Sequence, residues 1–114
     1  MKNSIRKDWK LIESLIQEKS KVLDIGCGEG ELIKQLNKNI NADTRGIEID
    51  PALARKAIGA GLNVVQGNAE DGLSQYSNQS FDYVILSQTL QAMNKPKDVL
   101  IDLLRIGSKA IVSF

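Results

Sequence analysis

Apolar residues recur along this chain with two periods, one typical of helices and one typical of strands. The spacing of Ile5, Trp9, Ile12 and Ile16 places them on one stripe and predicts an amphipathic helix at about 3–18. Short apolar runs predict strands at residues 22–25, 45–49, 62–66, 81–87 and 110–114. Helices are expected at about 29–38, from Pro51 to the glycines at 59–61 and from Pro96 to Gly107, with a polar connection at 67–79 and a helical turn at 88–93.

The apolar positions also predict which helix faces are buried. In the helix that begins at Pro51, after the capping residue Asp50, the inward residues are expected to be Leu53, Ala54, Ala57 and Ile58. In the helix that begins at Pro96, the expected apolar side consists of Val99, Leu100, Leu103 and Leu104. The run Val-Ile-Leu at 84–86 indicates a strand buried on both faces.

Strands that alternate with helices predict an α/β fold with a parallel sheet and right-handed crossovers. We expect a doubly wound, Rossmann-like sheet with strand order 3-2-1-4-5, in a single domain over residues 1–114. Ligands of such sheets bind beyond the carboxyl ends of the strands, at the switch point between strands 1 and 4. The unusual residues of the sequence fall at these ends, at 24–30, 48–50, 67–71 and 87–91.

Composition narrows the function classes. Fifteen Lys and Arg against fourteen Asp and Glu give a net charge of +1, so no strong attraction to nucleic acid or anionic lipid is expected. The absence of histidine excludes Ser-His-Asp and Cys-His catalysis and histidine-ligated metals. A single cysteine excludes an internal disulfide and a multi-cysteine zinc site, and fits a reducing cytoplasm. No apolar run is long enough to predict a membrane span, and no metal is expected.

The loop after the first predicted strand is rich in glycine and acidic. Gly26, Gly28 and Gly30 allow a ligand to approach the backbone, with Cys27 between them as a small side chain that fits. The dinucleotide fingerprint needs glycine at position 31, where Glu31 stands, which disfavours a nicotinamide-dependent oxidoreductase. Asp24, at an apolar strand end, indicates a cationic ligand. S-adenosylmethionine, which carries a sulfonium and an ammonium group and no phosphate, fits this loop.

The other strand ends supply polar groups suited to a nucleoside. Glu48 would accept hydrogen bonds from both ribose hydroxyls, and Ile49 would lie against the adenine. Asn68 would accept a hydrogen bond from the adenine amino group, and the backbone N–H of Ala69 would donate to the ring. Ser87 would lie beside the methyl group, and the residues expected to orient a methyl acceptor are Gln88, Thr89 and Gln91.

Simpler structural roles remain open for each position. Asp24 could cap loop amides, Glu48 could end its strand in solvent, and Ile49 could belong to the core. Asn68 could form an ordinary turn, and Ser87 or Thr89 could cap a helix. Glu29 and Glu31 could simply favour the N-terminus of the following helix.

The residues at 22–30, Val-Leu-Asp-Ile-Gly-Cys-Gly-Glu-Gly, resemble the first motif of class I S-adenosylmethionine-dependent methyltransferases. Gly-Ile-Glu-Ile-Asp at 46–50 resembles their ribose-binding motif. A closer resemblance, to the MetW methionine-biosynthesis family, rests on Asn-Val-Val-Gln-Gly at 63–67, Phe-Asp-Tyr-Val-Ile-Leu-Ser-Gln-Thr-Leu-Gln-Ala at 81–92 and Ala-Ile-Val-Ser-Phe at 110–114. The similarity extends from about Asp8 to Phe114.

This resemblance implies a methyltransferase-like protein of methionine biosynthesis that binds S-adenosylmethionine or S-adenosylhomocysteine. The resemblance does not identify the methyl acceptor, and it leaves an alternative function, that of a non-catalytic regulatory partner of homoserine O-acyltransferase. No catalytic residue follows from the motifs, because methyl transfer from a sulfonium depends mainly on alignment and exclusion of water.

Two features depart from the family. Related sequences commonly have Asp where Asn68 stands, and they continue past residue 114 with two further strands. The resemblance therefore implies a C-terminally shortened or minimal member. The edge of its fifth strand would be open to pairing with another chain, for example in a homodimer.

Overall fold

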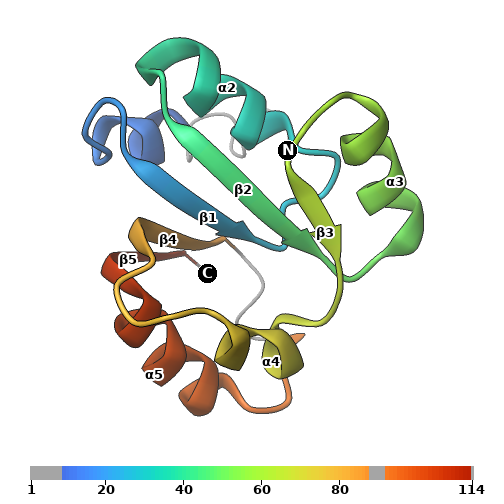
Figure 1. The fold of residues 1–114 in the computed structure, drawn as a ribbon, viewed down its shortest axis with the longest axis vertical. Helices are drawn as coiled ribbons and strands as arrows, with labels where there is room; N and C mark the ends of the chain where they lie inside the picture. The colour runs from blue at the N-terminus through green and yellow to red at the C-terminus, as the bar shows by residue number, and fades with distance from the viewer. Residues whose placement is uncertain (1–8, 88–91, 114) are drawn as a thin grey trace.

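The structure is a computed structural model that describes residues 9–87 and 92–113 of the 114-residue chain. Its sheet is parallel, with the strand order β3-β2-β1-β4-β5 (Figure 1), which confirms the predicted doubly wound fold. The strands are β1 (Lys21–Ile25), β2 (Asp43–Glu48), β3 (Val64–Gln66), β4 (Phe81–Ser87) and β5 (Gly107–Ser113). The helices are α2 (Glu31–Ile40), α3 (Pro51–Gly59), α4 (Ala69–Gly72), the 3-10 helix η1 (Leu73–Gln75) and α5 (Pro96–Ile106).

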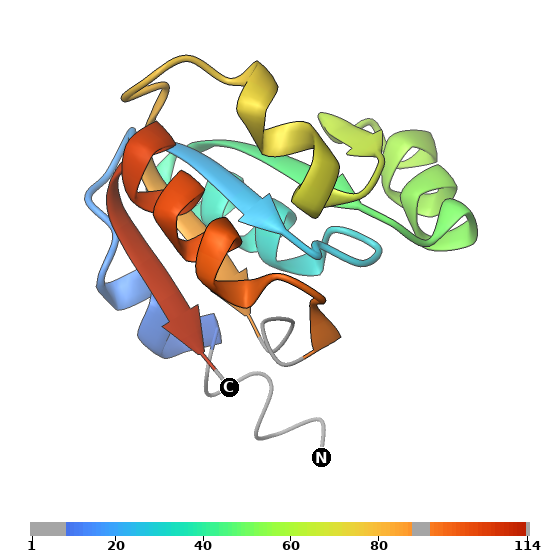
Figure 2. The same ribbon diagram turned by 90° about the horizontal axis from the view of Figure 1, so that it is seen from below.

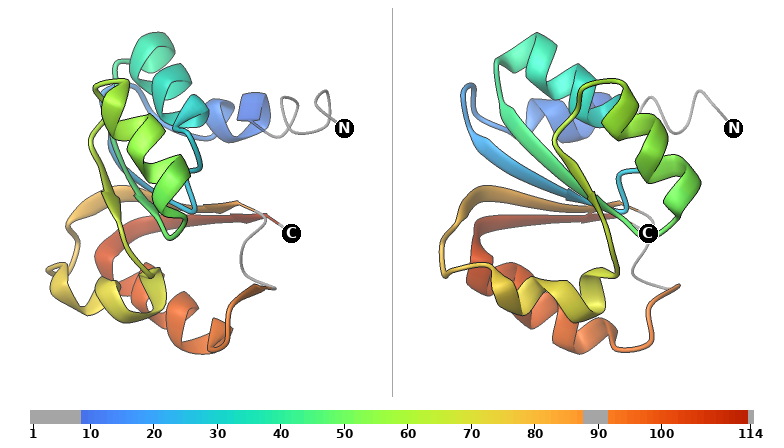
Figure 3. Two further views of the ribbon diagram at one scale, coloured as in Figure 1. Left: turned by 90° about the vertical axis from the view of Figure 1, so that its right-hand side faces the viewer. Right: turned by 45° about the vertical axis from the view of Figure 1, so that its right-hand side comes forward.

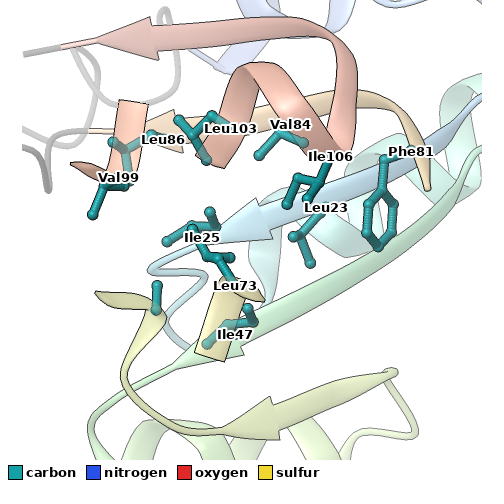
Figure 4. Packing of buried hydrophobic residues seen from close by; sticks show 11 residues of the cluster. Leu23, Ile25, Ile47, Leu73, Phe81, Val84, Leu86, Val99, Leu103 and Ile106 are labelled. Carbon is teal, nitrogen blue, oxygen red and sulfur yellow. The ribbon is translucent and has the colours of Figure 1, made fainter. Parts of the chain in front are cut away.

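Helices cover both faces of the sheet. The helical residues 9–14, α2 and α3 lie on one face, and α4 and α5 lie on the other (Figures 2 and 3). The α5 face holds the largest aliphatic cluster, in which Leu23, Val84 and Leu103 are fully buried (Figure 4). Residues 84–86 are buried on both faces of β4, as their apolar run predicts. Burial of this aliphatic surface is the main force that holds the layers together.

The N-terminal helix ends earlier than residue 18. Residues 9–14 are helical, and the part of the predicted helix before residue 9 lies outside the described residues. After residue 14 the backbone tightens, with hydrogen bonds from Leu15 N to Ile12 O and from Ile16 N to Glu13 O. The chain then turns toward the sheet, where Gln17 N donates to the Tyr83 hydroxyl at 3.2 Å. Of the predicted apolar stripe, Ile12 and Ile16 are buried, Trp9 is half-buried, and Ile5 lies outside the described residues.

Two side chains predicted to face inward are exposed. Ile58 of α3 is 49% exposed and Leu104 of α5 is 66% exposed. Ile58 lies at the rim of the buried stripe of α3, whereas Leu104 lies on the side of α5 that points away from Val99 and Leu103. Neither side chain belongs to a buried hydrophobic cluster of the described residues. The remaining predicted inward residues, Leu53, Ala54, Ala57, Val99, Leu100 and Leu103, are buried or half-buried.

The fifth strand begins three residues before the predicted start. Gly107 ends α5 and starts β5 at once, with extended backbone angles of φ −117° and ψ 143°. A Cβ on Gly107 would lie 2.6 Å from Val84 Cγ2, so only glycine lets the backbone pass this close to β4. The chain therefore passes from helix to strand without a loop.

Candidate functional site at the carboxyl edge of the sheet

The glycine loop after β1 folds back against β2. Gly26 N donates to Ile47 O at 2.8 Å, and Cys27 N donates to the same oxygen at 3.2 Å. Gly26, Gly28 and Gly30 all have positive φ angles, of 77°, 60° and 89°, which side-chain-bearing residues rarely adopt. A Cβ on Gly28 would meet nothing within 4 Å, so the loop presents open backbone at that position.

Glu48 fixes this loop to the end of β2. Its Oε1 accepts a hydrogen bond from Gly28 N at 2.7 Å, and its Oε2 accepts one from Asp50 N at 2.9 Å. The side chain is 7% exposed, so it is not the solvated strand end considered as an alternative. Each carboxylate oxygen can accept a second hydrogen bond, which leaves both available to a diol.

Asp24 is a buried carboxylate, with 3% of its surface exposed. No hydrogen bond or ion pair to its side chain is found within the described residues, so it does not cap loop amides there. Burial raises the pKa of Asp24 from 3.8 to about 7, and the negative charge of Glu48 contributes in second place. A buried carboxylate without a partner is costly, and a cation would relieve that cost.

Cys27 serves packing rather than chemistry. A Cβ on Gly46 would lie 2.5 Å from Cys27 Sγ, so the thiol occupies the space that a larger residue in β2 would need. Burial, followed by the charges of Asp24 and Glu48, raises the pKa of the Cys27 thiol to about 12. A thiol in this environment stays protonated and is a poor nucleophile.

The segment after β2 offers an apolar side chain to solvent. Ile49 is 59% exposed. The alternative interpretation, in which Ile49 belongs to the core, is therefore wrong. Asp50 caps α3, accepting hydrogen bonds from Ala52 N and Leu53 N, and Pro51 occupies the first helical turn as predicted. An exposed isoleucine directly after β2 offers an apolar surface against which a nucleobase can pack.

The turn after β3 has the local role that its residues favour. Asn68 caps α4, and its Oδ1 accepts a hydrogen bond from Glu70 N at 2.9 Å. Its side chain is exposed, whereas Ala69 is buried in the cluster beneath α5. The capping oxygen keeps one free lone pair, while Asn68 Nδ2 is a donor, the wrong polarity for an amino group.

The acidic residues beside the loop lie at the surface. Glu31 is exposed at the start of α2, and the exposed Glu29 pairs with Lys56 of α3, with a distance of 3.2 Å from Lys56 Nζ to Glu29 Oε1. Both positions agree with the simpler reading of acids at a helix N-terminus.

The last predicted site residues lie at the carboxyl end of β4. The backbone of Ser87 pairs with Ser113 of β5 at the same edge of the sheet. The residues predicted to orient an acceptor, Gln88, Thr89 and Gln91, lie outside the described residues.

Glu70 lies in the segment 67–71 that the sequence indicates as part of the site, but its contacts with residues 94 and 95 were not predicted. Glu70 of α4 accepts hydrogen bonds from Asn94 N at 3.1 Å and Lys95 N at 2.8 Å, which joins the turn after β3 to the start of α5. Asn94 and Lys95 are 24 and 25 residues from Glu70 in the sequence, and no periodicity or motif links them to it.

Together these residues fit an S-adenosyl group. Register brings the ends of β1 and β2 side by side, with Asp24 opposite Gly46 and Ile25 opposite Ile47. One edge therefore holds a buried carboxylate that has no partner within residues 9–87 and 92–113, a carboxylate with free lone pairs, an open glycine backbone and an exposed isoleucine. This donor and acceptor set matches a cation, a ribose and a nucleobase, and offers no cation to a pyrophosphate.

Comparison with known proteins identifies the family. Residues 6–114 match the family described as "Methionine biosynthesis protein MetW". The chain belongs to the MetW family. A curated relative of this family, the bifunctional methionine biosynthesis protein MetXA/MetW of Rhodopirellula baltica, is 33% identical over 115 residues. The match covers 94% of this chain and 18% of the relative, so this MetW chain spans less than a fifth of that protein.

Solved structures share the fold of this MetW chain. A TehB-like SAM-dependent methyltransferase from Corynebacterium glutamicum has a TM-score of 0.76 and 23% identity, and the match covers 93% of this chain and 60% of that one. A SAM-dependent methyltransferase from Methanosarcina mazei has a TM-score of 0.68 and 26% identity, with 85% and 51% covered. The sheet of the MetW chain is thus the methyltransferase sheet, and the chain spans about half the length of these proteins.

Over residues 9–87 and 92–113, no helix has the length and apolar character needed to cross a bilayer. The same residues contain no group of three or more His, Cys, Asp or Glu side chains arranged to hold a metal ion.

Proposed function

We propose that this MetW domain binds S-adenosylmethionine, or its product S-adenosylhomocysteine, at the carboxyl edge of β1 and β2, as a methyltransferase-like protein. The observation that carries the proposal is Asp24, a carboxylate that is 3% exposed and has no partner among the described residues. Its position beside an open glycine loop makes a cationic ligand the natural partner.

Each residue has a distinct task in this proposal. Asp24 attracts the positive charge of the ligand, and Glu48 accepts hydrogen bonds from the ribose hydroxyls while it holds Gly28 N. Ile49 covers one face of the adenine, and the turn at Asn68 and Ala69 contacts its edge. Bound S-adenosylmethionine supplies an activated methyl group, so the residues contribute by orienting it and excluding water rather than by acid or base chemistry.

Thermal denaturation with and without S-adenosylmethionine tests this function. A ligand at 100 times its dissociation constant stabilises the folded state by about 2.7 kcal/mol, which raises Tm by several degrees. Asp24→Asn and Glu48→Ala should each remove most of that shift. Asp43→Asn is the matched control, because Asp43 is an exposed acid at the opposite end of β2. An unchanged Tm at millimolar S-adenosylmethionine would refute the proposal.

A second candidate function is that of a regulatory partner of homoserine O-acyltransferase. The observation that favours it is the bifunctional relative, in which a MetXA part and a MetW part occupy one chain. Fusion holds the two parts of that relative at a high effective concentration, which favours a direct contact between them.

Mixing experiments separate this candidate from catalysis. The two purified proteins should co-elute in size-exclusion chromatography at micromolar concentration, and the acyl-transfer rate should change on mixing. Two independent elution peaks together with an unaltered acyl-transfer rate would dismiss the regulatory role.

A further inference from the structure

Glu70 makes a two-point contact between parts of the chain that are distant in sequence. One carboxylate oxygen accepts from Asn94 N at 3.1 Å and the other from Lys95 N at 2.8 Å. Two hydrogen bonds to one planar carboxylate fix the orientation as well as the separation of the groups they join. The start of α5 is thereby tied to α4.

The same residue is tied to the turn at the predicted nucleobase position. Glu70 N donates to Asn68 Oδ1 at 2.9 Å, so the side chain that would meet the adenine edge also holds the backbone of Glu70. Ala69, between them, is buried in the α5 cluster and anchors the turn from below. A shift of this turn therefore moves the Glu70 carboxylate with it.

The start of α5 has no other described cap. Lys95, the N-cap residue, makes no side-chain capping hydrogen bond, and Pro96 in the first turn has no N–H to donate. Met93 packs against the same apolar cluster as Ala69, which keeps the approach to α5 next to α4. Within the described residues, the Asn94 and Lys95 amides thus depend on Glu70 alone for their hydrogen bonds.

We propose that Glu70 is a positioning residue through which occupation of the nucleobase turn is transmitted to the start of α5. The proposal rests on the function proposed above and adds a coupling between the nucleobase turn and the start of α5. A ligand that immobilises Asn68 and Ala69 also immobilises the Glu70 carboxylate, and with it the Asn94 and Lys95 amides. Helix α5 begins there and leads directly into the edge strand β5. Ligand binding would therefore restrain the start of the segment that ends in this strand.

Amide hydrogen exchange measured by NMR on the full chain tests this coupling. S-adenosylhomocysteine is the probe, because it occupies the site without turnover. On its addition, exchange at the Asn94 and Lys95 amides should slow by about tenfold in the wild-type protein, as expected when a charged hydrogen bond is held more firmly. In Glu70→Gln the slowing should be lost, because an amide side chain offers only one acceptor atom in place of two.

Asp71→Asn is the matched control. Asp71 is the next residue of α4, is exposed, and has no side-chain hydrogen bond or ion pair within the described residues, so the variant removes the same charge without touching the contact. It should retain the ligand-dependent slowing. Glu70→Gln should still bind S-adenosylhomocysteine in calorimetry, with an affinity lower by at most about tenfold, because coupling between two sites is reciprocal.

The outcomes distinguish this inference from the proposed function. Ligand binding with slowed exchange in the wild type and in Asp71→Asn, but not in Glu70→Gln, supports the positioning role. Ligand binding with unchanged exchange at Asn94 and Lys95, or with equal slowing in Glu70→Gln, overturns the role while the binding function stands. Absence of binding to the wild-type protein overturns both.

Discussion

Asp24 is a buried carboxylate near the end of β1, close enough to Glu48 to feel its charge. Its charge lowers the stability of the ligand-free fold, whereas a cationic ligand needs that charge. Its charged form has little contact with water, which raises its pKa to about 7. A protein selected for stability alone would place an uncharged residue there. The carboxylate is understandable if a cation completes the site, as with other residues whose pKa values are perturbed at functional positions.

Asp24→Asn should therefore stabilise the ligand-free protein in a pH-dependent way. Unfolded Asp24 loses its proton near pH 3.8 and folded Asp24 near pH 7, so wild-type stability falls as pH rises between these values and stays low above them. The gain in the variant should be absent below about pH 4 and greatest above pH 7, with an upper bound of about 4 kcal/mol. Urea denaturation at pH 4, 6 and 8 measures it, and a gain that is equal at all three values would contradict the buried-charge explanation.

At Asn68, the identity of one terminal side-chain atom determines whether the residue can accept a hydrogen bond from adenine while it caps α4. Its Oδ1 caps α4, and the other terminal atom is an amide nitrogen. Asn68→Asp keeps the cap and adds an oxygen that can accept from the adenine amino group.

We expect this variant to bind S-adenosylhomocysteine about tenfold more tightly, as one added charge-assisted hydrogen bond allows. Isothermal calorimetry measures the change. Asn63→Asp, which adds the same charge at an exposed position before β3, should leave the affinity as it is. Equal gains in the two variants would assign the effect to net charge instead of to the base contact.

At the level of elements, the glycine loop after β1 contains two positions with different constraints. Gly28 has a φ of 60° and open space at its Cβ position, whereas a Cβ on Gly30 would lie 2.3 Å from Leu62 Cδ1. The first position is free for a ligand, and the second packs the start of α2 against the segment before β3.

Gly28→Ala and Gly30→Ala should separate these two roles. Gly28→Ala should lower the free energy of unfolding by only about 1 to 2 kcal/mol, the usual cost of a left-handed residue, yet abolish ligand binding because its methyl group fills the open space. Gly30→Ala adds a steric conflict and should cost more, with partial recovery in the double variant with Leu62→Ala. Denaturation and calorimetry provide both readouts. Unimpaired ligand binding in Gly28→Ala would place the ligand elsewhere.

Elements whose signals are local were predictable from the sequence. Asp50 and Pro51 mark the start of α3, and the apolar run 84–86 marks a central strand. The alternation of such strands and helices along the chain predicts the strand order from the sequence. Features set by tertiary contacts were not predictable. The early start of β5 depends on the contact of Gly107 with Val84, and the Glu70 contact joins elements 24 and 25 residues apart. The roles of Asp24 and Glu48 toward a ligand stay predictions until binding is measured.

For the whole molecule, the sheet ends in β5, an edge strand whose outer side has no neighbouring strand among the described residues. Leu104 and Ile101, both largely exposed, lie on the outer surface of α5, the helix that packs on the face of the sheet next to this edge. On another side of α5, the Arg105 guanidinium points toward the segment before β4 and donates hydrogen bonds to Tyr76 O and Leu73 O. An open strand edge next to exposed apolar side chains favours pairing with a second copy, and a net charge of +1 opposes it only weakly.

We therefore expect the 114-residue chain to self-associate through the β5 side of the molecule. Ile101→Lys and Leu104→Lys should shift the equilibrium toward monomer without loss of stability, because both side chains already lie mostly in solvent. Ile58→Lys places the same charge on α3, at the opposite end of the sheet, and should leave the association unchanged. Sedimentation velocity over a range of protein concentrations measures all four proteins. A wild-type chain that stays monomeric throughout, or an equal effect of Ile58→Lys, would show that the exposed residues of α5 do not form an interface.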